Sequence, residues 1–336
     1  MRTQLLTILV VLTLSLSSCW KDEDPIVLPS GGNTIQESVS LGQNYDKMAY
    51  FNIDERRFII RNLADWDLAF ESSEEGLHIV VNGGKGYTVL ETPTTNFASG
   101  FEFLQGMPFK WDAPSGNLDS TAVGKWWDDV SKESRNKLYF INTKPMEVPT
   151  TGTANSTDCM RFQILEANKT SYRIKIGKYD DTVGTVYTIP KDHKRNFSYL
   201  NFTTGEIKTD FEPEKDTWDV VFTYYRHVYF DMTPNIGYTL VGVLLNPNKV
   251  EAYEERSKKF EDIDLAYAQN VKFTKNAEVI GFDWKDYNQV TGRYTTNPKI
   301  TYIVKTISGY YYKIRFLDFY DTTGVKGTPL FDMQRL

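Results

Sequence analysis

The fold is decided by a stretch that occurs twice in this chain. Residues 64–70 read ADWDLAF, and residues 216–222 read DTWDVVF. Each stretch follows a shorter shared motif, which is YFNI at residues 50–53 and YLNF at residues 199–202. Matching motifs in the same order are typical of a tandem repeat. We therefore expect two related domains that fold alike.

The Trp-Asp pair is the centre of each copy. We expect Trp66 and Trp218 to be buried structural anchors, because an indole ring buries a large area and its N–H can find a partner. Asp67 and Asp219 are expected to accept hydrogen bonds from the backbone, and a catalytic role is not expected for either.

A third match closes each copy, with YRIKI at residues 172–176 and YKIRF at residues 312–316. The join lies near residues 184–196, where Pro and Lys interrupt the pattern. We divide the chain into domains at residues 41–190 and 191–336.

Alternating apolar and polar residues predict that both domains are mainly β. In YKIRF the apolar residues fall on one face of a strand and the charged residues on the other. We expect strands at residues 86–90, 160–165, 171–176, 238–245, 301–306 and 310–319. Helical patterns are few, and we expect short helices at residues 120–132 and 262–269. The predicted fold class is two tandem antiparallel β domains with a few short helices.

Residues 1–18 have the pattern of a secretory signal peptide. Arg2 precedes an apolar run at residues 5–16 that is too short for a stable membrane span. The run ends in LSSC, which resembles a bacterial lipobox, so we expect lipid attachment at Cys19. The buried lipid chains would hold the protein at the membrane surface.

Residues 19–40 are expected to form a flexible tether. Lys21 and three acids follow Cys19 closely, similar to the surface-export signal of lipoproteins in the Bacteroidota. The alternative is a charged tether that only stays solvated. The segment predicts an outer-membrane lipoprotein that is exposed at the cell surface.

Composition excludes some functions. The formal net charge of −6 argues against nucleic-acid binding, which relies on clustered positive charge. Cys159 is the only cysteine left once Cys19 carries lipid, so no intrachain disulfide is expected. No metalloprotease, nucleophile-elbow or phosphate-loop motif occurs, and we expect no enzyme activity.

Several motifs resemble the HmuY-like haem-binding lipoproteins of the Bacteroidota. The motifs are DWDLAF at residues 65–70, NGGK at residues 82–85, NFTTG at residues 201–205, and YKIRFLDFY at residues 312–320. The resemblance implies a surface lipoprotein that takes up haem, free or from host haemoproteins. It also implies delivery to an outer-membrane TonB-dependent haem receptor for iron acquisition.

Members of that family hold haem iron by two axial ligands, usually His and sometimes Met. The donors available here, with no other metal expected, are His78, Met107, His227 and Met232. Three of the four have a structural alternative. A half-buried hydrogen-bonded role would suit His78, core packing would suit Met107, and an aromatic cluster would suit His227. His193 lies in a solvated charge run.

Two other functions stay open. A glycan-binding protein would stack exposed aromatic residues on sugar rings, and the chain offers Trp111, Trp126, Trp127 and Trp284. A structural protein would keep the fold without the haem ligands. Residues 112–119 contain oxygen donors for Ca²⁺ but miss the EF-hand spacing, so a turn is the better interpretation.

Overall fold

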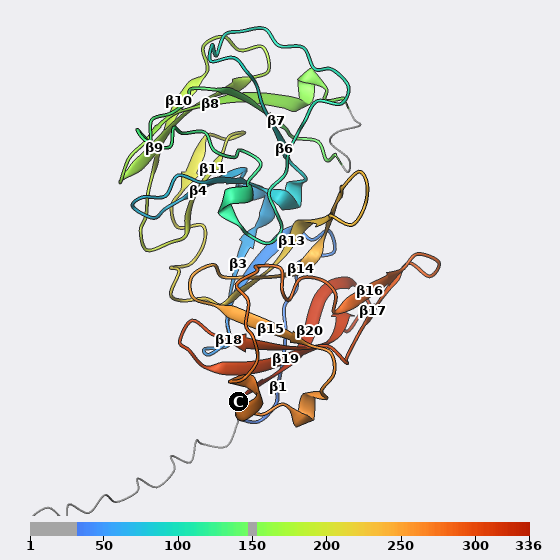
Figure 1. Ribbon diagram of the computed structural model, residues 1–336. Coiled ribbons are helices and arrows are strands. Elements are labelled where there is room, and N and C mark those ends of the chain that lie inside the picture. The colour runs from blue at the N-terminus through green and yellow to red at the C-terminus, as the bar shows by residue number, and fades with distance from the viewer. Residues whose placement is uncertain (1–31, 147–152) are drawn as a thin grey trace, which may run out of the picture. The chain divides into compact units, whose positions relative to one another are not determined.

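The computed structural model describes residues 32–146 and 153–336, drawn in colour in Figure 1. Residues 32–336 form one compact unit. The predicted signal peptide and Cys19 lie outside the described residues. Nearly all regular structure that is described is strand, and every strand pairing is antiparallel. The predicted mainly β class is therefore confirmed.

Two five-stranded sheets, which we name A and D, have matching strand orders. Sheet A contains, in spatial order, β1 (Ile35–Ser38), β20 (Lys326–Arg335), β19 (Tyr311–Tyr320), β18 (Thr301–Lys305) and β15 (Glu251–Glu255). Sheet D contains β10 (Thr185–Pro190), β9 (Ser171–Lys178), β8 (Cys159–Ala167), β7 (Leu138–Asn142) and β6 (Thr88–Glu91).

Two four-stranded sheets, B and C, also have matching strand orders. Sheet B contains β14 (Ile236–Leu245), β13 (Val220–Tyr229), β2 (Lys47–Asn52) and β3 (Arg57–Asn62). Sheet C contains β5 (Ile79–Val81), β4 (Leu68–Glu71), β11 (Phe197–Asn201) and β12 (Glu206–Lys208). A separate hairpin joins β16 (Lys285–Asn288) to β17 (Arg293–Thr296).

The short helices are η1 (Leu63–Asp65), η2 (Gly83–Lys85), η3 (Leu118–Ser120), η4 (Ser156–Asp158), η5 (Phe260–Asp262) and α2 (Leu265–Ala268). The helix predicted at residues 262–269 is confirmed in part, since Asp264 caps α2 by accepting from Tyr267 N at 2.8 Å. The helix predicted at residues 120–132 is wrong. Gly124 and Lys132 have φ angles of 64° and 61°, which an α-helix cannot contain.

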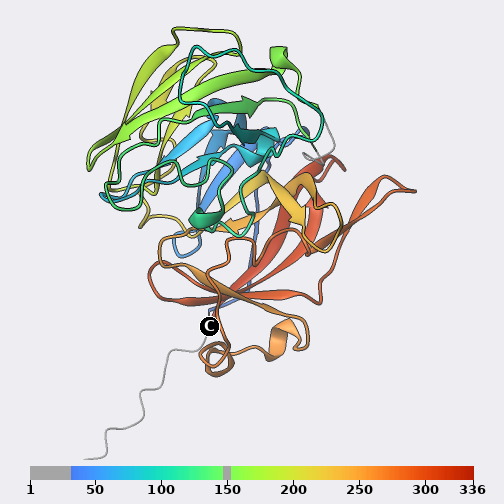
Figure 2. The ribbon, with the colours of Figure 1, turned by 45° about the horizontal axis from the view of Figure 1, so that its top comes forward.

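The two halves exchange their first hairpins. Hairpin β2–β3 pairs with β13 of the second half, and β11–β12 pairs with β4 of the first half. The two pairings have the same register. Tyr50 and Tyr199 open the equivalent motifs YFNI and YLNF, and they face the equivalent residues Val221 and Ala69. In Figures 1 and 2, blue strands of the first half accordingly lie beside yellow and orange strands of the second. The division at residue 190 stays a prediction, since the pairing crosses it.

The two repeated aspartates hold the exchanged hairpins. Asp67 Oδ2 accepts from Phe202 N at 2.9 Å, and Asp219 Oδ2 accepts from Ile53 N at 2.7 Å. Asp219 Oδ1 also accepts from Ile307 N at 2.7 Å. Both carboxylates are completely buried. Their predicted role as backbone acceptors is confirmed.

Alternate residues of the inner strands face different layers. In β2, Ala49 and Phe51 pack into a core shared by sheets A and B, whereas Met48 and Tyr50 pack into a core shared by sheets B and C. Sheets C and D share a third core. Sheets B and C are therefore buried on both faces, which explains why their strands are rich in large apolar residues on both sides.

Two sequence boundaries differ from the structure. The predicted tether at residues 19–40 contains β1, which pairs with β20 from Ile35 to Ser38. The motifs at residues 172–176 and 312–316 fall on β9 and β19, which hold different positions in their sheets. By position, β8 matches β19 and β9 matches β20. The alternating pattern located these strands but could not tell neighbouring strands apart.

We expect Asp219→Ala to destabilise the protein by about 3 kcal/mol, because two buried N–H groups lose their acceptor. Chemical denaturation of the chain from Gly32 onward would measure the change. Asp216→Ala is the matched control, since Asp216 is exposed and its partners Asn248 and Lys249 lie at the surface. Equal effects of the two substitutions would contradict the anchoring role.

Candidate functional site

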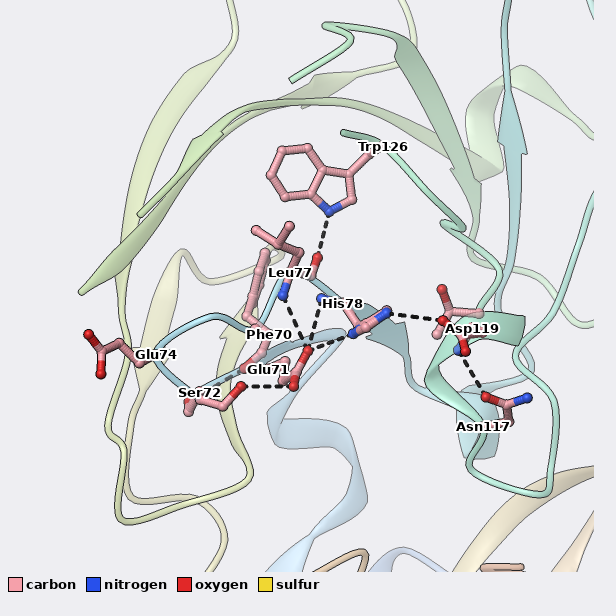
Figure 3. A network of polar contacts seen from close by, with 12 residues as sticks. Phe70, Glu71, Ser72, Glu74, Leu77, His78, Asn117, Asp119 and Trp126 are labelled. Atoms are coloured by element: carbon pink, nitrogen blue, oxygen red, sulfur yellow. Dashed lines mark hydrogen bonds and ion pairs between the residues drawn. The ribbon is translucent and has the colours of Figure 1, made fainter. Parts of the chain in front are cut away.

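His78 lies between two carboxylates just before β5 (Figure 3). Its Nδ1 is 2.6 Å from Glu71 Oε2, and its Nε2 is 3.7 Å from Asp119 Oδ1. Glu71 also accepts from the backbone N–H groups of Leu77 and His78. Both ring nitrogens of His78 thus face an acid, and the side chain is only 23% exposed.

These contacts shift the pKa values of His78 and Glu71. The hydrogen bond to Glu71 raises the pKa of His78 against the opposing effect of burial. Burial opposes ionisation of Glu71 too, but hydrogen bonds from His78 and Ser73 hold its pKa at about 2. The His78–Glu71 ion pair stabilises the fold at pH values between the pKa of Glu71 and the pKa of His78. Its contribution is lost when pH rises through the pKa of His78 or falls through that of Glu71.

Met107 packs against a separate apolar cluster that includes Phe109 and Phe140. Met107 therefore has the core packing that was the alternative interpretation, and the ligand pair of the first half stays a prediction.

His227 lies on β13 and has a different environment. Its Nδ1 is 2.5 Å from Glu278 Oε1, which also accepts from Tyr225 OH at 2.7 Å. A carboxylate on Nδ1 fixes the proton there and leaves Nε2 with its lone pair for a metal. No described residue occupies Nε2. The side chain is 20% exposed.

Aromatic rings surround His227. Tyr229 and Phe282 meet the imidazole ring at centroid distances of 4.6 Å and 4.8 Å. Tyr238 is directly opposite His227 on β14, so the two side chains share one face of the sheet. The predicted aromatic cluster around His227 is therefore present. The rings of this cluster do not hydrogen-bond to the nitrogens of the His227 imidazole.

The end of the β13–β14 hairpin exposes further apolar residues. Phe230 is 61% exposed, Met232 41% and Tyr238 52%. Met232 lies in the turn between β13 and β14. Such a group of exposed large side chains is typical of a binding surface.

The predicted sugar-stacking residues are mostly unsuited to that role. Trp126 and Trp284 are buried to 1% and 0% exposure. Trp126 Nε1 donates to Leu77 O at 2.6 Å (Figure 3), as a core residue would. Trp111 lies against the guanidinium of Arg226. The preferred turn interpretation of residues 112–119 fits, since Asp112 accepts from Val81 N and Ala122 N.

Cys159 is buried and free at the start of β8. Burial raises the pKa of its thiol to about 12, so it is not a reactive nucleophile. Among the residues that the structure describes, no group of three or more His, Cys, Asp or Glu could hold a metal ion. No described helix is long and apolar enough to cross a membrane.

Sequence reasoning missed the acids that hold the two candidate histidines. Glu71 and Glu278 orient the two histidines, yet neither stands in a motif. Arg226 could have been noticed, because it places a full charge in the middle of a strand made mostly of apolar and aromatic residues.

The comparisons with known proteins agree with the predicted resemblance. Residues 193–333 match the family model described as HmuY protein. The matched segment runs from before β11 into β20, and it includes His227, Met232 and Glu278. The resemblance to HmuY-like proteins is thereby confirmed over this part of the chain. No curated protein matches the chain.

Two solved structures are similar over most of their length. The apo HmuY analog of Tannerella forsythia has 10% identity and a TM-score of 0.25, covering 91% of this chain and 97% of its own. Apo PinO of Porphyromonas gingivitis has 10% identity and a TM-score of 0.26, covering 90% and 97%. At these values neither structure indicates what this chain binds.

We expect Glu71→Gln to lower the pKa of His78, because it removes the negative partner of Nδ1. An NMR titration of the imidazole resonances would measure the shift. Glu75→Gln is the control, since Glu75 is 83% exposed and pairs with Lys169 instead. An unchanged His78 pKa in Glu71→Gln would show that the pair does not set it.

Proposed function

We propose that this protein binds haem through His227. The observation that carries the proposal is the imidazole held by Glu278 through Nδ1, with Nε2 left for an axial bond. The same residue lies inside the segment that matches the HmuY family model. Haem iron commonly takes a neutral imidazole as its axial donor.

The surroundings of His227 suit a porphyrin. Tyr229, Tyr238 and Phe282 provide aromatic surface beside the imidazole, and apolar contact supplies much of the affinity for a flat macrocycle. When bound, haem would supply the iron centre, and the chain would supply the orientation of His227. The role of the chain is binding, not catalysis.

Met232 is the residue that we propose would hold the iron together with His227. Met232 is partly exposed and lies on the turn of the same hairpin that carries His227. His78 is a weaker candidate, because Glu71 and Asp119 face both of its nitrogens. Met107 is weaker still, because it is packed against a core.

We further propose that the chain acts at the cell surface. Lipid on Cys19 would anchor it to the outer membrane, and the acids after Cys19 would direct its display. Haem would then be taken from the medium or from host haemoproteins and passed to an outer-membrane TonB-dependent receptor. The lipobox-like sequence and the family match support this part of the proposal.

Titration of the chain from Gly32 onward with haemin tests the binding proposal. We expect a sharpened and shifted Soret band that His227→Ala abolishes. His78→Ala is the matched control and should keep the band. Met232→Leu should keep binding but move the band, because one axial ligand changes. Glu278→Gln should weaken affinity about tenfold to a hundredfold through the lost orientation of His227.

A featureless titration of the wild-type chain would reject haem binding. The fold would then serve a structural role, or a glycan-binding role that a glycan array would reveal. A band that disappears in His78→Ala and survives in His227→Ala would move the site to the first half of the chain.

A further inference from the structure

A cavity of about 270 Å³ lies between the two inner sheets, B and C. Its wall is mainly apolar, and the large rings of Tyr50, Trp66, Tyr199 and Trp218 line it. An apolar cavity of roughly 150 Å³ takes up benzene, so this one has room for a molecule of two fused rings. A porphyrin is larger than this space, and the cavity is therefore not a second haem site.

The two anchor indoles turn carbon, not nitrogen, toward the cavity. Trp66 and Trp218 are 8% and 4% exposed, and both line the cavity. Each Nε1 is inaccessible and has no hydrogen-bond partner among the described residues. The expectation that each indole N–H finds a partner within the core is therefore wrong, because the surrounding cluster consists of apolar and aromatic side chains. The part of each indole that reaches the cavity is hydrocarbon.

Two acids of the wall are held by the protein's own donors. Asp112 accepts from Val81 N and Ala122 N, at 2.7 Å and 2.6 Å. Glu212 accepts from Phe197 N at 2.8 Å. Burial raises the pKa of each carboxyl to about 7, which shows that this part of the interior disfavours charge.

Arg226, which also belongs to the wall, is held in a similar way. Its Nη2 donates to Gly86 O at 2.5 Å, and Asp112 acts on it as a nearby negative charge. Its Nε and Nη1 are inaccessible. A charged ligand would therefore lose its hydration without gaining a free counter-ion from Asp112, Glu212 or Arg226.

The cavity opens between a loop of the first half and a loop of the second. Gly116, Asn117 and Lys275 belong to its wall and are exposed, which places the opening there. Ala277 N donates to Ser115 O at 2.9 Å and joins the two loops. Gly116 has a φ angle of 72°, and a Cβ at this position would lie 2.9 Å from the Cβ of Ala277. The glycine thus allows the two loops to meet at the entrance.

The arrangement of the rings favours an aromatic ligand. Tyr50 meets Trp218 and Tyr199 meets Trp66 edge to face, at centroid distances of 5.0 Å and 5.3 Å. Such contacts are a preferred geometry between aromatic rings. Packed sheets lie about 10 Å apart, so the space between them is closer to a slot than to a sphere. A flat ring system fits a slot and makes ring contacts that an aliphatic molecule cannot make.

We propose that the cavity between sheets B and C is a binding site for a small uncharged molecule of two fused aromatic rings. The rings of Tyr50, Trp66, Tyr199 and Trp218 surround the ligand, and the burial of apolar surface supplies most of its affinity. His227 is not among the residues that line the cavity, so this site is separate from the proposed haem site. Its occupation does not depend on haem binding.

Isothermal titration of the chain from Gly32 onward with indole tests the proposal. We expect one site per chain. Indole-3-carboxylate should bind at least about tenfold more weakly, because its charge would lose water without a counter-ion. In an NMR spectrum, intermolecular Overhauser contacts should join the indole ring protons to the methyl groups of Ala69 and Val221, which line the cavity from sheets C and B.

Two substitutions test the position of the site. Ala69→Leu fills the cavity from β4 and should weaken indole binding at least about tenfold, because the added atoms occupy the space of the ligand. Val80→Phe fills the cavity from β5, where the native side chain is only partly buried and a larger one is easier to accommodate. Val183→Phe is the matched control, since Val183 is 75% exposed and does not line the cavity. Circular dichroism establishes that each variant folds.

The proposal is overturned if wild-type protein does not bind indole, or if every folded filling variant binds it with unchanged affinity. Overhauser contacts that exclude Ala69 and Val221 would overturn it independently of the variants. Equal affinities for indole and indole-3-carboxylate would overturn the assignment of an uncharged ligand. The haemin titration separates the two sites, since Val80→Phe should keep the Soret change and His227→Ala should keep indole binding.

Discussion

Two buried carboxylates hold this fold together. Asp67 and Asp219 each accept the backbone N–H that follows the first hairpin strand of the other half. A carboxylate taken out of water is costly unless its oxygens are hydrogen-bonded, so each aspartate requires the other half's hairpin to be in place. The same hairpins are then paired by β4 and β13 in matching register. The exchange therefore makes each half depend on the other.

The central layer follows from that exchange. Because β2 and β11 each lie in the interior of an inner sheet, their side chains point alternately into two different cores. The Trp66 and Trp218 rings meet Tyr199 and Tyr50 edge to face in the central core. Rings of this size do not fill the space between two twisted sheets completely, and a cavity with polar edges results.

The two histidines show how similar local contacts lead to different chemistry. His78 and His227 each place Nδ1 against a glutamate. The difference is at Nε2, where His78 faces Asp119 and His227 faces no described acceptor or donor. His78 is thus a member of an ion pair, whereas His227 is the residue that we propose as the iron ligand. The two halves share a fold and differ in the side chains that surround the histidine.

The sequence by itself determined the repeated anchors, the mainly β class, the positions of a minority of the strands (β6, β8, β9, β14, β18 and β19) and the family resemblance. These features depend on the alternation of apolar and polar residues and on short motifs, both of which can be recognised within a few consecutive residues. The set of candidate donors was also available, because His and Met are few. Helix prediction failed at residues 120–132, where left-handed backbone at Gly124 and Lys132 breaks the pattern.

Only the tertiary structure decided which strands pair, and with which half. Pairing of β11 with β4 joins residues far apart in the chain, and no local pattern distinguishes it from pairing within one half. Our proposed ranking of the donors rests on contacts of the same long-range kind. Glu278 is 51 residues from His227, and Asp119 approaches His78 from a separate loop. Long-range contacts of this kind set the availability of a lone pair, and sequence spacing does not encode them.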